Sequence, residues 1–574
     1  MGLSTGANFQ WLRLLWEVPS HLLIENRKES KEGKKWAFLA KGGEFATFYQ
    51  KFHVVVDWSG DGYHLGQWKL AELSMGRASE NNSKCWNQTK YFRPGVTWSA
   101  RSQRGASFRV LPPNSIFGSK GPAILVNDNQ EETLLALVAL TNSSSFSLLL
   151  SIQMAFGSYE VGTIKRTPVP ILDPVQKSFL ADACLRSWSL KRTIDSVEET
   201  SLAFLLPTLL RSRLGPYDSN QAESALTDIQ RQINDIAFDL YKFEDGDRAA
   251  IDMPLLLKDD NISGEVSSDE DDAETEVPAD NQPALLSWCI GVAFGRFDWR
   301  LATSERPAPP EPSPFDPLPT KSPGTLPDGA EPFHAHSGLL VDDQGHPHDL
   351  ALLIEEVFGR VNLTPPDDTR RWLQRDFFAF HLQRYSKSRR KAPIYWPLST
   401  MSSSYTLWVY YPSVTSQTLY TAINDFVEPK LKQIGADVTA LRNKASVRTR
   451  DDEKQFEALQ AFELELIELR DTLLKLAPTY KPNHNDGVQI TAAPLWPLFR
   501  HKPWQKILKD TWAKLEKGDY DWAHLAMNYW PERVREKCRN DKSLAIAHGL
   551  EDLYVEPEAA PKKTRGRKKT GAGE

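Results

Sequence analysis

Cysteine is scarce in this chain of 574 residues. Its four thiols lie about a hundred or more positions apart, at Cys85, Cys184, Cys289 and Cys538. A zinc knuckle needs two cysteines within a few residues of each other, and a disulfide framework needs a much denser set. The spacing therefore excludes a local CxxC metal site and predicts buried, unpaired thiols.

Long apolar runs are also missing. No stretch approaches the about 20 apolar residues that a membrane-spanning helix requires. The N-terminal segment carries an apolar stripe but neither a basic leader nor an A-x-A cleavage site, so it does not have the pattern of a secretion signal. These absences predict a soluble, cytoplasmic chain with no membrane partner.

Recognisable catalytic motifs are absent as well. We find no GxxxxGK phosphate loop, no HExxH zinc motif, and no glycine-rich turn with an Asn/Asp-Pro-Pro-aromatic loop of the kind a methyltransferase uses. Asn114 follows its two prolines instead of preceding them. The histidines His334, His336, His346 and His348 surround one loop and are interpreted as solvated. We expect no catalytic residue, cofactor or metal ion in this chain, although a degenerate nuclease pattern stays open.

Acidic residues outnumber basic ones, which gives a formal net charge of −6. Much of the acid lies in segment 259–280, which repels itself and cannot bury a core, so we predict a linker there. Binding to a polyanion depends on where charge lies along the surface. The average over the chain therefore does not exclude DNA as a partner.

The length of the chain predicts several folding units, each with its own core. Short apolar runs broken by prolines and glycines predict a β-rich first unit, and apolar steps of three and four residues predict helices further on. The overall prediction is an α+β multidomain fold with Pro-rich and acidic linkers. Its predicted parts are a β-rich domain (1–172), a helical region (173–258), an acidic linker (259–283), an apolar segment with a Pro-rich connector (284–333), an α/β region (334–420), a helical hairpin spacer (421–478), a helical cap (479–556) and a disordered basic tail (557–574).

Local patterns give sharper predictions. Gly42 and Gly43 stand between two aromatic runs, which predicts a β-hairpin over 36–49. The segment 158–172 is predicted to be a strand that enters a proline stop. The predicted helices and strands beyond these are helices over 134–150, 223–243 and 372–385, a strand over 404–412, and two long antiparallel helices between Leu431 and Leu476.

The stretch 91–120 has the composition of a surface that binds nucleic acid. It mixes basic and aromatic side chains and contains no acidic residue. Guanidinium groups pair with phosphates and guanine edges, while flat rings add contact area. The alternative is an ordinary hairpin region with solvated arginines and core aromatics. The residues concerned are Arg93, Arg101, Arg104, Arg109 and Lys120, with Tyr91, Phe92, Trp98, Phe108 and Phe117.

Two further segments are basic. Residues 384–391 hold five basic side chains beside an aromatic strand, and the tail contains Lys-Lys-Thr-Arg-Gly-Arg-Lys-Lys over 562–569. The Arg-Gly-Arg core of the tail fits an A·T-rich minor groove, and a generic solvated tail with nonspecific affinity for phosphates is the alternative.

Taken in order, the motifs of this chain resemble one family. Their succession looks like the C-terminal half of large class-IIG-like N6-adenine DNA methyltransferases, the enzymes of the BREX (PglX) and DISARM phage-defence systems. Ala7 stands where an acidic residue is common in that family. The motifs that carry the resemblance are Gly2–Asn8 with Trp16–Val18, Lys41–Glu44, Tyr91–Phe117, Gly162–Pro170, Phe294–Arg300 and Arg390–Pro397, and the match extends to about residues 485–488.

In that family an N-terminal Rossmann-like domain carries S-adenosylmethionine and an NPPY-type catalytic loop, and the half that follows recognises the DNA sequence. The chain starts almost at the junction of these halves. The resemblance therefore implies a double-stranded-DNA target-recognition part, without catalytic residues or cofactor, that needs a separate S-adenosylmethionine-binding methyltransferase chain and works with other phage-defence proteins.

The resemblance also implies which parts contact DNA. The first domain would contact bases, while the 334–420 clamp region, the helical hairpin and the cap would grip the duplex. The expected DNA-binding residues are Lys41, Arg93, Arg101, Arg104, Arg109 and Lys120, with Trp98 and Phe108 as shaping or wedging rings, and Lys387, Arg389, Arg390 and Lys391 on the DNA backbone.

Two other classes of function stay open. The chain could be an assembly scaffold of a phage-defence complex, in which DNA contact is incidental, or a DNA nuclease. A steep fall of DNA affinity with salt would favour recognition over a scaffold, because neutralised phosphates release counterions. Metal-dependent cleavage by the purified chain would support the nuclease.

Overall fold

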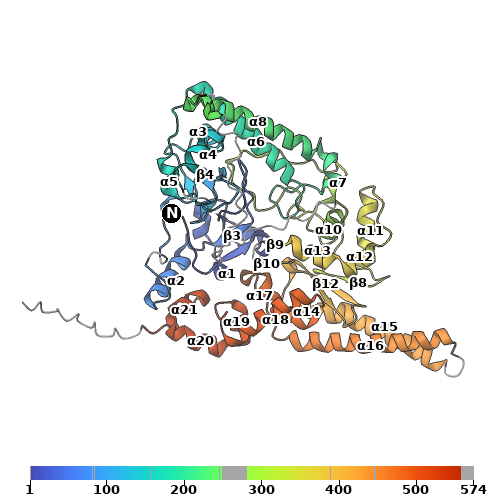
Figure 1. The fold of residues 1–574 in the computed structure, drawn as a ribbon. Coiled ribbons are helices and arrows are strands. Elements are labelled where there is room, and N and C mark those ends of the chain that lie inside the picture. The colour runs from blue at the N-terminus through green and yellow to red at the C-terminus, as the bar shows by residue number, and fades with distance from the viewer. Residues whose placement is uncertain are drawn as a thin grey trace, which may run out of the picture.

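The computed structural model describes residues 2–80, 82, 84–154, 157–244, 246–248, 281–387, 390–444 and 448–556. The fold is mixed α+β, as predicted, with four small sheets among the described residues and helices around them (Figure 1). The predicted acidic segment 259–280 and the basic tail 557–574 lie outside the described residues. All four cysteines are free. Cys184, Cys289 and Cys538 are buried, as expected, whereas Cys85 is only half-buried.

The N-terminal sheet has the strand order β1-β3-β2-β6. Its central strand β2 pairs antiparallel with β3 and parallel with β6. The predicted hairpin over 36–49 is wrong, because the chain leaves β2 at Gly42 and Gly43 without folding back on it. Phe48 instead joins the second sheet, where its N–H donates to the Phe108 carbonyl over 2.8 Å. The elements here are α1 (Asn8–Trp11), β1 (Leu12–Leu14), β2 (Trp36–Ala40), β3 (Val54–Asp57), α2 (Tyr63–Ser74) and β6 (Ser115–Phe117).

The second sheet, β5-β4-β7, is covered by helices (Figure 1). The helix predicted over 134–150 forms as two helices with a break at Asn142 and Ser143, and the one over 223–243 is confirmed. The strand predicted over 158–172 is wrong: its first part is a short helix that buries Thr163 and Ile164. The elements are β4 (Gly95–Trp98), β5 (Phe108–Leu111), β7 (Ala123–Ile124), α3 (Glu131–Thr141), α4 (Ser144–Ser151), α5 (Val161–Arg166), α6 (Pro174–Asp195), α7 (Thr208–Arg211) and α8 (Ser219–Tyr241).

The third sheet, β11-β12-β8, lies in the largest core and confirms the strand predicted over 404–412. The helix predicted over 372–385 forms as two helices that break at Asp376. A fourth sheet is the two-stranded pair β10-β9. The elements are α10 (Asn281–Ala293), β8 (Leu339–Asp342), α11 (Leu350–Arg360), α12 (Thr369–Arg375), α13 (Phe377–Arg384), β9 (Ser386–Lys387), β10 (Arg390–Lys391), β11 (Tyr395–Ser399), β12 (Thr406–Tyr410) and α14 (Thr418–Thr421).

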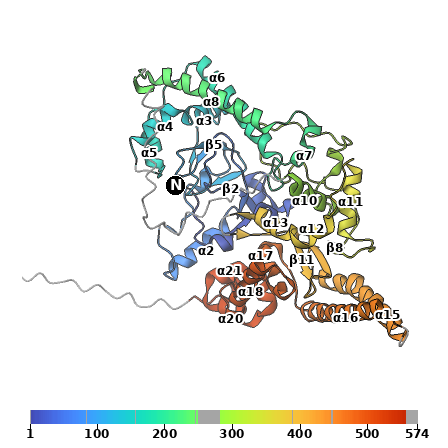
Figure 2. The same cartoon turned by 45° about the vertical axis from the view of Figure 1, so that its right-hand side comes forward.

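The predicted helical hairpin is confirmed. It consists of α15 (Glu428–Asn443), which continues a π-helical turn over Ala422–Val427, and α16 (Arg450–Leu476). Arg470 of α16 lies 3.7 Å from Glu428 at the start of α15, so the two helices run antiparallel. They project from the body of the molecule (Figures 1 and 2).

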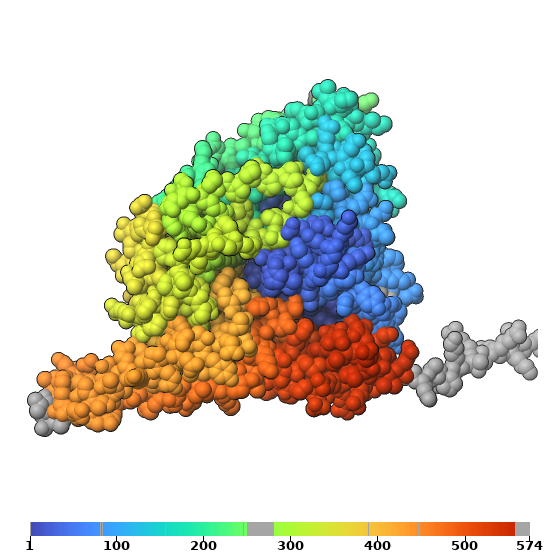
Figure 3. Space-filling model, turned by 180° about the vertical axis from the view of Figure 1, so that it is seen from behind, coloured from blue at the N-terminus to red at the C-terminus, as the bar shows by residue number. Residues whose placement is uncertain are grey.

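The helical cap follows the hairpin and consists of α17 (Val488–Ala492), α18 (Lys502–Lys517), α19 (His524–Tyr529), α20 (Pro531–Asn540) and α21 (Lys542–His548). It packs back against α2, where Arg77 pairs with Asp541 over 3.0 Å. The Pro-rich connector over 306–333 contains no helix and no named strand. Seen from behind, it lies on the surface between the upper helices and the N-terminal segment (Figure 3).

No single helix of the described residues is both long and apolar enough to cross a membrane. The helices α3 and α4 meet that requirement only as a pair, and they bend by 65° at their break. The buried side chains of both belong to the core under the second sheet.

A buried ionic network, which we call the junction, ties the N-terminal segment to the cap. The Glu17 carboxylate accepts the N–H groups of Leu14 (2.7 Å) and Val488 (3.0 Å), and it pairs with Arg390 over 2.7 Å. Arg13 donates to the Asn485 carbonyl over 2.6 and 3.0 Å. Burial, and then the positive charge of Arg390, lowers the pKa of Arg13 to about 10.

Gly487 is required at the junction for two reasons. Its φ of +82° is a conformation that glycine adopts without strain, and a Cβ there would lie 2.8 Å from Oε1 of Glu17. The junction therefore joins β1, β10 and the start of the cap through one buried carboxylate.

We expect Arg390→Ala to lower the free energy of unfolding by about 3 kcal/mol, because it leaves the Glu17 carboxylate buried without its cation. The measurement is the shift in thermal melting temperature. Lys391→Ala changes the other residue of β10, which is half-buried, and should cost no more than about 0.5 kcal/mol. Equal shifts for the two variants would contradict the role given to the junction.

Candidate nucleic-acid interface

The aromatic side chains of the 91–120 stretch are mostly core residues. Trp98 and Phe108 are 1% and 0% exposed, and the indole N–H of Trp98 donates to the Tyr159 carbonyl over 2.8 Å. Tyr91 and Phe117 are buried in the neighbouring N-terminal core. Trp98 and Phe108 therefore cannot reach DNA from this fold, and the wedging role expected of them is replaced by packing between the sheet and its helices.

Arg109 is also committed to the interior. Its guanidinium donates to the Ser99 hydroxyl and, over 3.3 Å, to the Glu44 carbonyl. Burial lowers its pKa to about 10. Arg93 is half-buried and donates to the Asn129 side chain (2.7 Å) and the Val126 carbonyl (2.8 Å). Both arginines hold loops together. The buried Arg109 therefore leaves the candidate interface, while a DNA contact of the half-buried Arg93 stays a prediction.

The remaining basic residues of this region lie together, on a surface that we call the basic edge: Lys41, Arg101, Arg104 and Lys120. All four are exposed. The loops that carry them are joined by backbone hydrogen bonds of 2.8 Å, from Ala100 N–H to the Lys120 carbonyl and from Gly118 N–H to the Ala40 carbonyl. The sheet thus brings residues about eighty positions apart in sequence to one rim.

Gly42 makes the close approach at this rim possible. A Cβ at this position would lie 2.6 Å from the Lys120 carbonyl oxygen, and its φ of +95° again favours glycine. The glycine pair that suggested a hairpin therefore allows two basic loops to meet.

Three of the four basic-edge residues have no acidic partner within the described part of the chain. Lys41, Arg104 and Lys120 make no ion pair with a described residue. On the neighbouring helix α5, Lys165 and Arg166 are likewise exposed and without an ion pair in the described ranges. Exposed cations that gather on one rim, without carboxylate partners in the described part of the chain, are available to bind a polyanion.

The basic segment 384–391 does not form such a surface. Arg384 pairs with Glu198 over 2.9 Å and Arg390 belongs to the junction. Lys387 and Lys391 are half-buried on the short strands β9 and β10, and Arg389 lies outside the described residues. The role of Arg390 on the DNA backbone is therefore corrected to a structural one, while roles for Lys387, Arg389 and Lys391 stay predictions.

Our reading of the sequence missed a second basic surface on α18, which we call the lysine stripe. Lys502, Lys506, Lys509 and Lys517 are exposed on the face opposite the buried side chains of this helix. Their steps of four, three and eight residues place them along about 22 Å of one side. None makes an ion pair with a described residue, and Lys509 lies 5.2 Å from the ring centre of Trp496. The lysine spacing was the signal that could have revealed it.

The four histidines around one loop are not solvated independently. His334 Nε2 and His348 Nδ1 form a hydrogen bond of 2.7 Å, and His346 stacks on Phe426 at the base of the helical hairpin. No group of three or more His, Cys, Asp or Glu side chains among the described residues could hold a metal ion. Burial, with the neighbouring His334 and His348, lowers the pKa of His336 to about 4.

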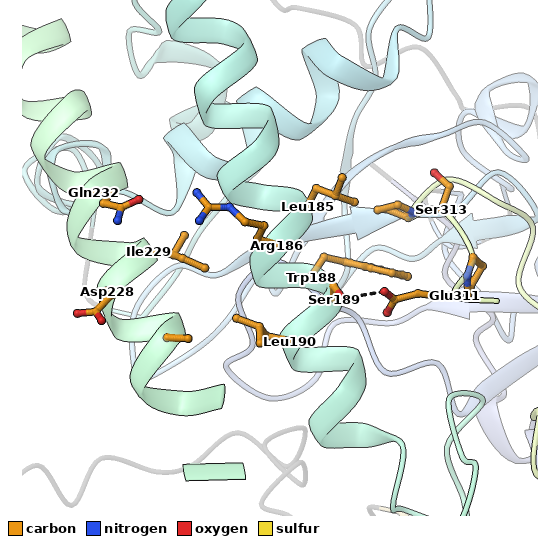
Figure 4. A pocket seen from close by; sticks show the side chains of 13 residues that line it. Leu185, Arg186, Trp188, Ser189, Leu190, Asp228, Ile229, Gln232, Glu311 and Ser313 are labelled. Atoms are coloured by element: carbon orange, nitrogen blue, oxygen red, sulfur yellow. Dashed lines mark hydrogen bonds between the residues drawn. The ribbon is translucent and has the colours of Figure 1, made fainter. Parts of the chain in front are cut away.

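A groove lies between α6, α8 and the Pro-rich connector (Figure 4). Its volume is about 840 Å³, and Leu185, Trp188 and Ile229 contribute apolar walls. Its charged groups are paired within the chain: Arg186 lies 2.9 Å from Asp182, and Glu311 accepts from Ser189 over 2.7 Å. The groove offers no convergent polar groups of the kind that carry catalysis.

The sequence was compared with known proteins. No protein-family model matches the chain. Over 302 residues, 52% of the chain, it is 26% identical to the adenine-specific methyltransferase PglX of Lacticaseibacillus casei (strain Zhang). Over 462 residues, 72% of the chain, it is 21% identical to the adenine-specific methyltransferase BrxX of Escherichia coli O9:H4 (strain HS).

The chain is a distant homologue of adenine-specific methyltransferases. It spans only 24% of the length of PglX and 35% of that of BrxX. The resemblance to the PglX family is thereby confirmed at the level of homology, while the assignment to a half without the catalytic domain stays a prediction.

For His336 we predict a pH dependence of stability. Its pKa is about 4 in the folded chain and 6.5 when unperturbed, so the unfolded state binds the proton first as pH falls. The stability contributed by neutral His336 is complete above about pH 6.5 and is lost as pH falls toward 4, by about 2 kcal/mol for a partly exposed group. Melting temperatures of the wild type and His336→Asn across this range measure it.

His21→Asn provides the control, because His21 is exposed. It should keep the wild-type slope of melting temperature against pH. A His336→Asn variant with that same slope would show that another group titrates in this range.

Proposed function

We propose that this chain is the DNA target-recognition part of a split N6-adenine DNA methyltransferase in a BREX- or DISARM-like phage-defence system. The methyl-transfer step belongs to a separate part that binds S-adenosylmethionine. Nothing in this sequence supplies the glycine-rich turn or the Asn/Asp-Pro-Pro-aromatic loop for that step.

The observation that supports recognition most directly is the basic edge. Lys41, Arg101, Arg104 and Lys120 converge from three loops on a rigid pair of sheets, and the loops are held by backbone hydrogen bonds. Side chains on loops positioned by a rigid scaffold are suited to reading base edges. Arg101 and Arg104 are our choice for guanine or phosphate contacts, and Lys41 and Lys120 for phosphates.

The lysine stripe suits a different task. Lysine ammonium groups act as point charges and bind phosphates without reading bases. The stripe runs along one exposed side of the helix. It would bind the phosphates of the duplex regardless of their base sequence, while the basic edge reads the bases. This role replaces the one that we expected of Arg390.

The mechanism that follows is positional. Methylating the amino group of adenine requires the base to leave the stack, at a cost of a few kcal/mol. A recognition part that grips the duplex on both sides of the target offsets this cost through its phosphate contacts. The chain would thus select the site and stabilise the opened duplex for the catalytic part.

A scaffold function is the second candidate. Its support is the projecting helical hairpin and the exposed apolar side chains Leu464 and Leu474 on α16, at 68% and 47% exposure. A scaffold needs no counterion release, so its association with DNA would respond little to salt.

We predict that Arg101→Ala combined with Arg104→Ala abolishes the sequence preference of DNA binding, because it removes the two bidentate donors of the basic edge. The measurement is competition between duplexes with and without the target site, with the methyltransferase partner present, alongside methyl transfer to the same duplexes. Arg371→Ala with Arg375→Ala, two exposed arginines on α12, is the matched control. Unchanged preference in the Arg101/Arg104 variant would remove the basic edge from the proposal.

For the lysine stripe we expect a different response. Lys502→Gln, Lys506→Gln and Lys509→Gln together should reduce the slope of log affinity against log salt by about 2 to 3, because each phosphate contact contributes about 0.9. Affinity should fall equally for target and non-target duplexes. Lys28→Gln with Lys90→Gln, both exposed elsewhere, should leave the slope unchanged. A slope that stays flat even in the wild type would favour the scaffold.

A further inference from the structure

Exposed apolar side chains are concentrated in one short part of this chain. Seventeen large apolar residues are exposed among those described, and seven of them lie between Ile152 and Leu185. Single exposed apolar residues are ordinary on a soluble protein, but a cluster marks a contact surface. The number of exposed apolar side chains in this stretch therefore indicates that another molecule covers them.

The four most exposed of these seven residues define what we call the apolar ledge. Ile152, Val169, Ile171 and Val175 are 73%, 49%, 97% and 78% exposed. They come from the end of α4, the extended segment before α6, and the first turn of α6.

The ledge is held in place by polar contacts beneath it. Gln153 donates to the Thr167 hydroxyl over 3.2 Å, and the Tyr241 hydroxyl donates to the Pro168 carbonyl over 2.9 Å. Asp173 caps α6 by accepting from the N–H groups of Val175 and Gln176. A surface fixed this way is pre-organised for binding.

Positive charge flanks the ledge on one side. Lys165 and Arg166 form the exposed last turn of α5, just before the extended segment, and pair with no described carboxylate. An apolar centre with a polar rim is the usual anatomy of a protein interface. The groove further along α6 differs, because its charged groups are already paired within the chain.

The segment between α4 and α5 is hydrogen-bonded to the loop that carries Arg101 of the basic edge. The Tyr159 N–H donates to the Ala100 carbonyl over 2.8 Å, and the Ser102 N–H donates to the Gly157 carbonyl over 3.1 Å. The helix α5 begins two residues after Tyr159. A partner bound on the ledge would therefore lie beside a duplex held at the basic edge.

We propose that the apolar ledge docks a protein partner whose contact surface is apolar with carboxylates at its rim, and that this partner is the S-adenosylmethionine-binding methyltransferase part. The identity of the partner rests on the proposed function. Aliphatic side chains contribute little affinity for a phosphate backbone, so the ledge suits a protein better than DNA. The catalytic part is the partner that must lie next to the recognised DNA. Lys165 and Arg166 would pair with the carboxylates at the rim of the partner.

The test is reconstitution of methyl transfer with the full chain. Purified chain and a target duplex are titrated with a methyltransferase chain from the same genome that carries an Asn-Pro-Pro-aromatic loop, and transfer of a labelled methyl group is measured. Ile171→Asp with Val175→Asp should raise the half-saturating concentration at least about 30-fold, the effect of losing interface anchors. DNA binding by the variant alone should match the wild type.

A matched control is Leu209→Asp with Leu352→Asp, which places the same charges at exposed leucines on α7 and α11. It should change the half-saturating concentration by no more than about twofold, the range of surface substitutions. All these side chains are exposed, and circular dichroism with thermal melting confirms that the variants fold.

The outcomes separate this inference from the proposed function. Absence of methyl transfer with the wild-type chain at any concentration of the partner would overturn the proposed function. Normal transfer with an unchanged half-saturating concentration in the ledge variant would overturn the docking inference alone. A wild-type dimer that the ledge variant converts to monomers in sedimentation would assign the ledge to a second copy, and loss of binding to anionic phospholipid vesicles would assign it to a lipid surface.

Discussion

The architecture depends on one buried carboxylate. Glu17 is 1% exposed and connects three distant parts of the chain: its own backbone at Leu14, the cation of Arg390, and the N–H of Val488. A buried charge is tolerated only when it is paired and hydrogen-bonded on all sides. The arrangement is therefore specific, because any displacement of the N-terminal strand, of β10 or of the cap leaves part of the carboxylate unsatisfied.

The same constraint explains why basic residues that look alike in sequence differ in what they do. Arg13, Arg109, Arg384 and Arg390 are buried or nearly so, and each is used to hold segments together. Lys41, Arg104 and Lys120 on loops, and the lysine stripe on the outer face of α18, make no ion pair with a described residue. A guanidinium group carries a planar set of donors and can bridge carbonyls and carboxylates inside a protein. The four arginines above all act in this way.

Local patterns predicted the helices well and the strand pairing poorly. The heptad-like steps from Leu431 to Leu476 depend only on neighbours along the chain, and the hairpin formed as expected. The pairing of β2 with β6 joins residues far apart in sequence, so no local signal announced it. Gly42 and Gly43 indicated a positive φ correctly, but the reason was a close approach to Lys120 and not a turn.

The candidate site was predicted in part for the same reason. Composition identified the 91–120 stretch, and exposure then separated Arg101, Arg104 and Lys120 from the buried Arg109 and Trp98. Alternation along β4 and β5 did not reveal this, since both strands are buried on both faces. The lysine stripe, in contrast, follows the spacing of one helix face and could have been predicted from the sequence. It was missed because the tryptophans of this segment indicated only a packed helical cap.

The Pro-rich connector has a consequence for how such a chain can evolve. Asn114 and the backbone of Leu318 exchange two hydrogen bonds, of 2.8 and 3.0 Å, and Phe315 is part of the core under the second sheet. The connector is thus a late segment of the sequence that completes an early core. Recombination at a single point before the connector would therefore separate the first part of the chain from residues that complete its core. Under the proposed function, an exchange of DNA specificity would instead proceed through the surface loops that carry the basic edge, and it would leave both the connector and the junction untouched.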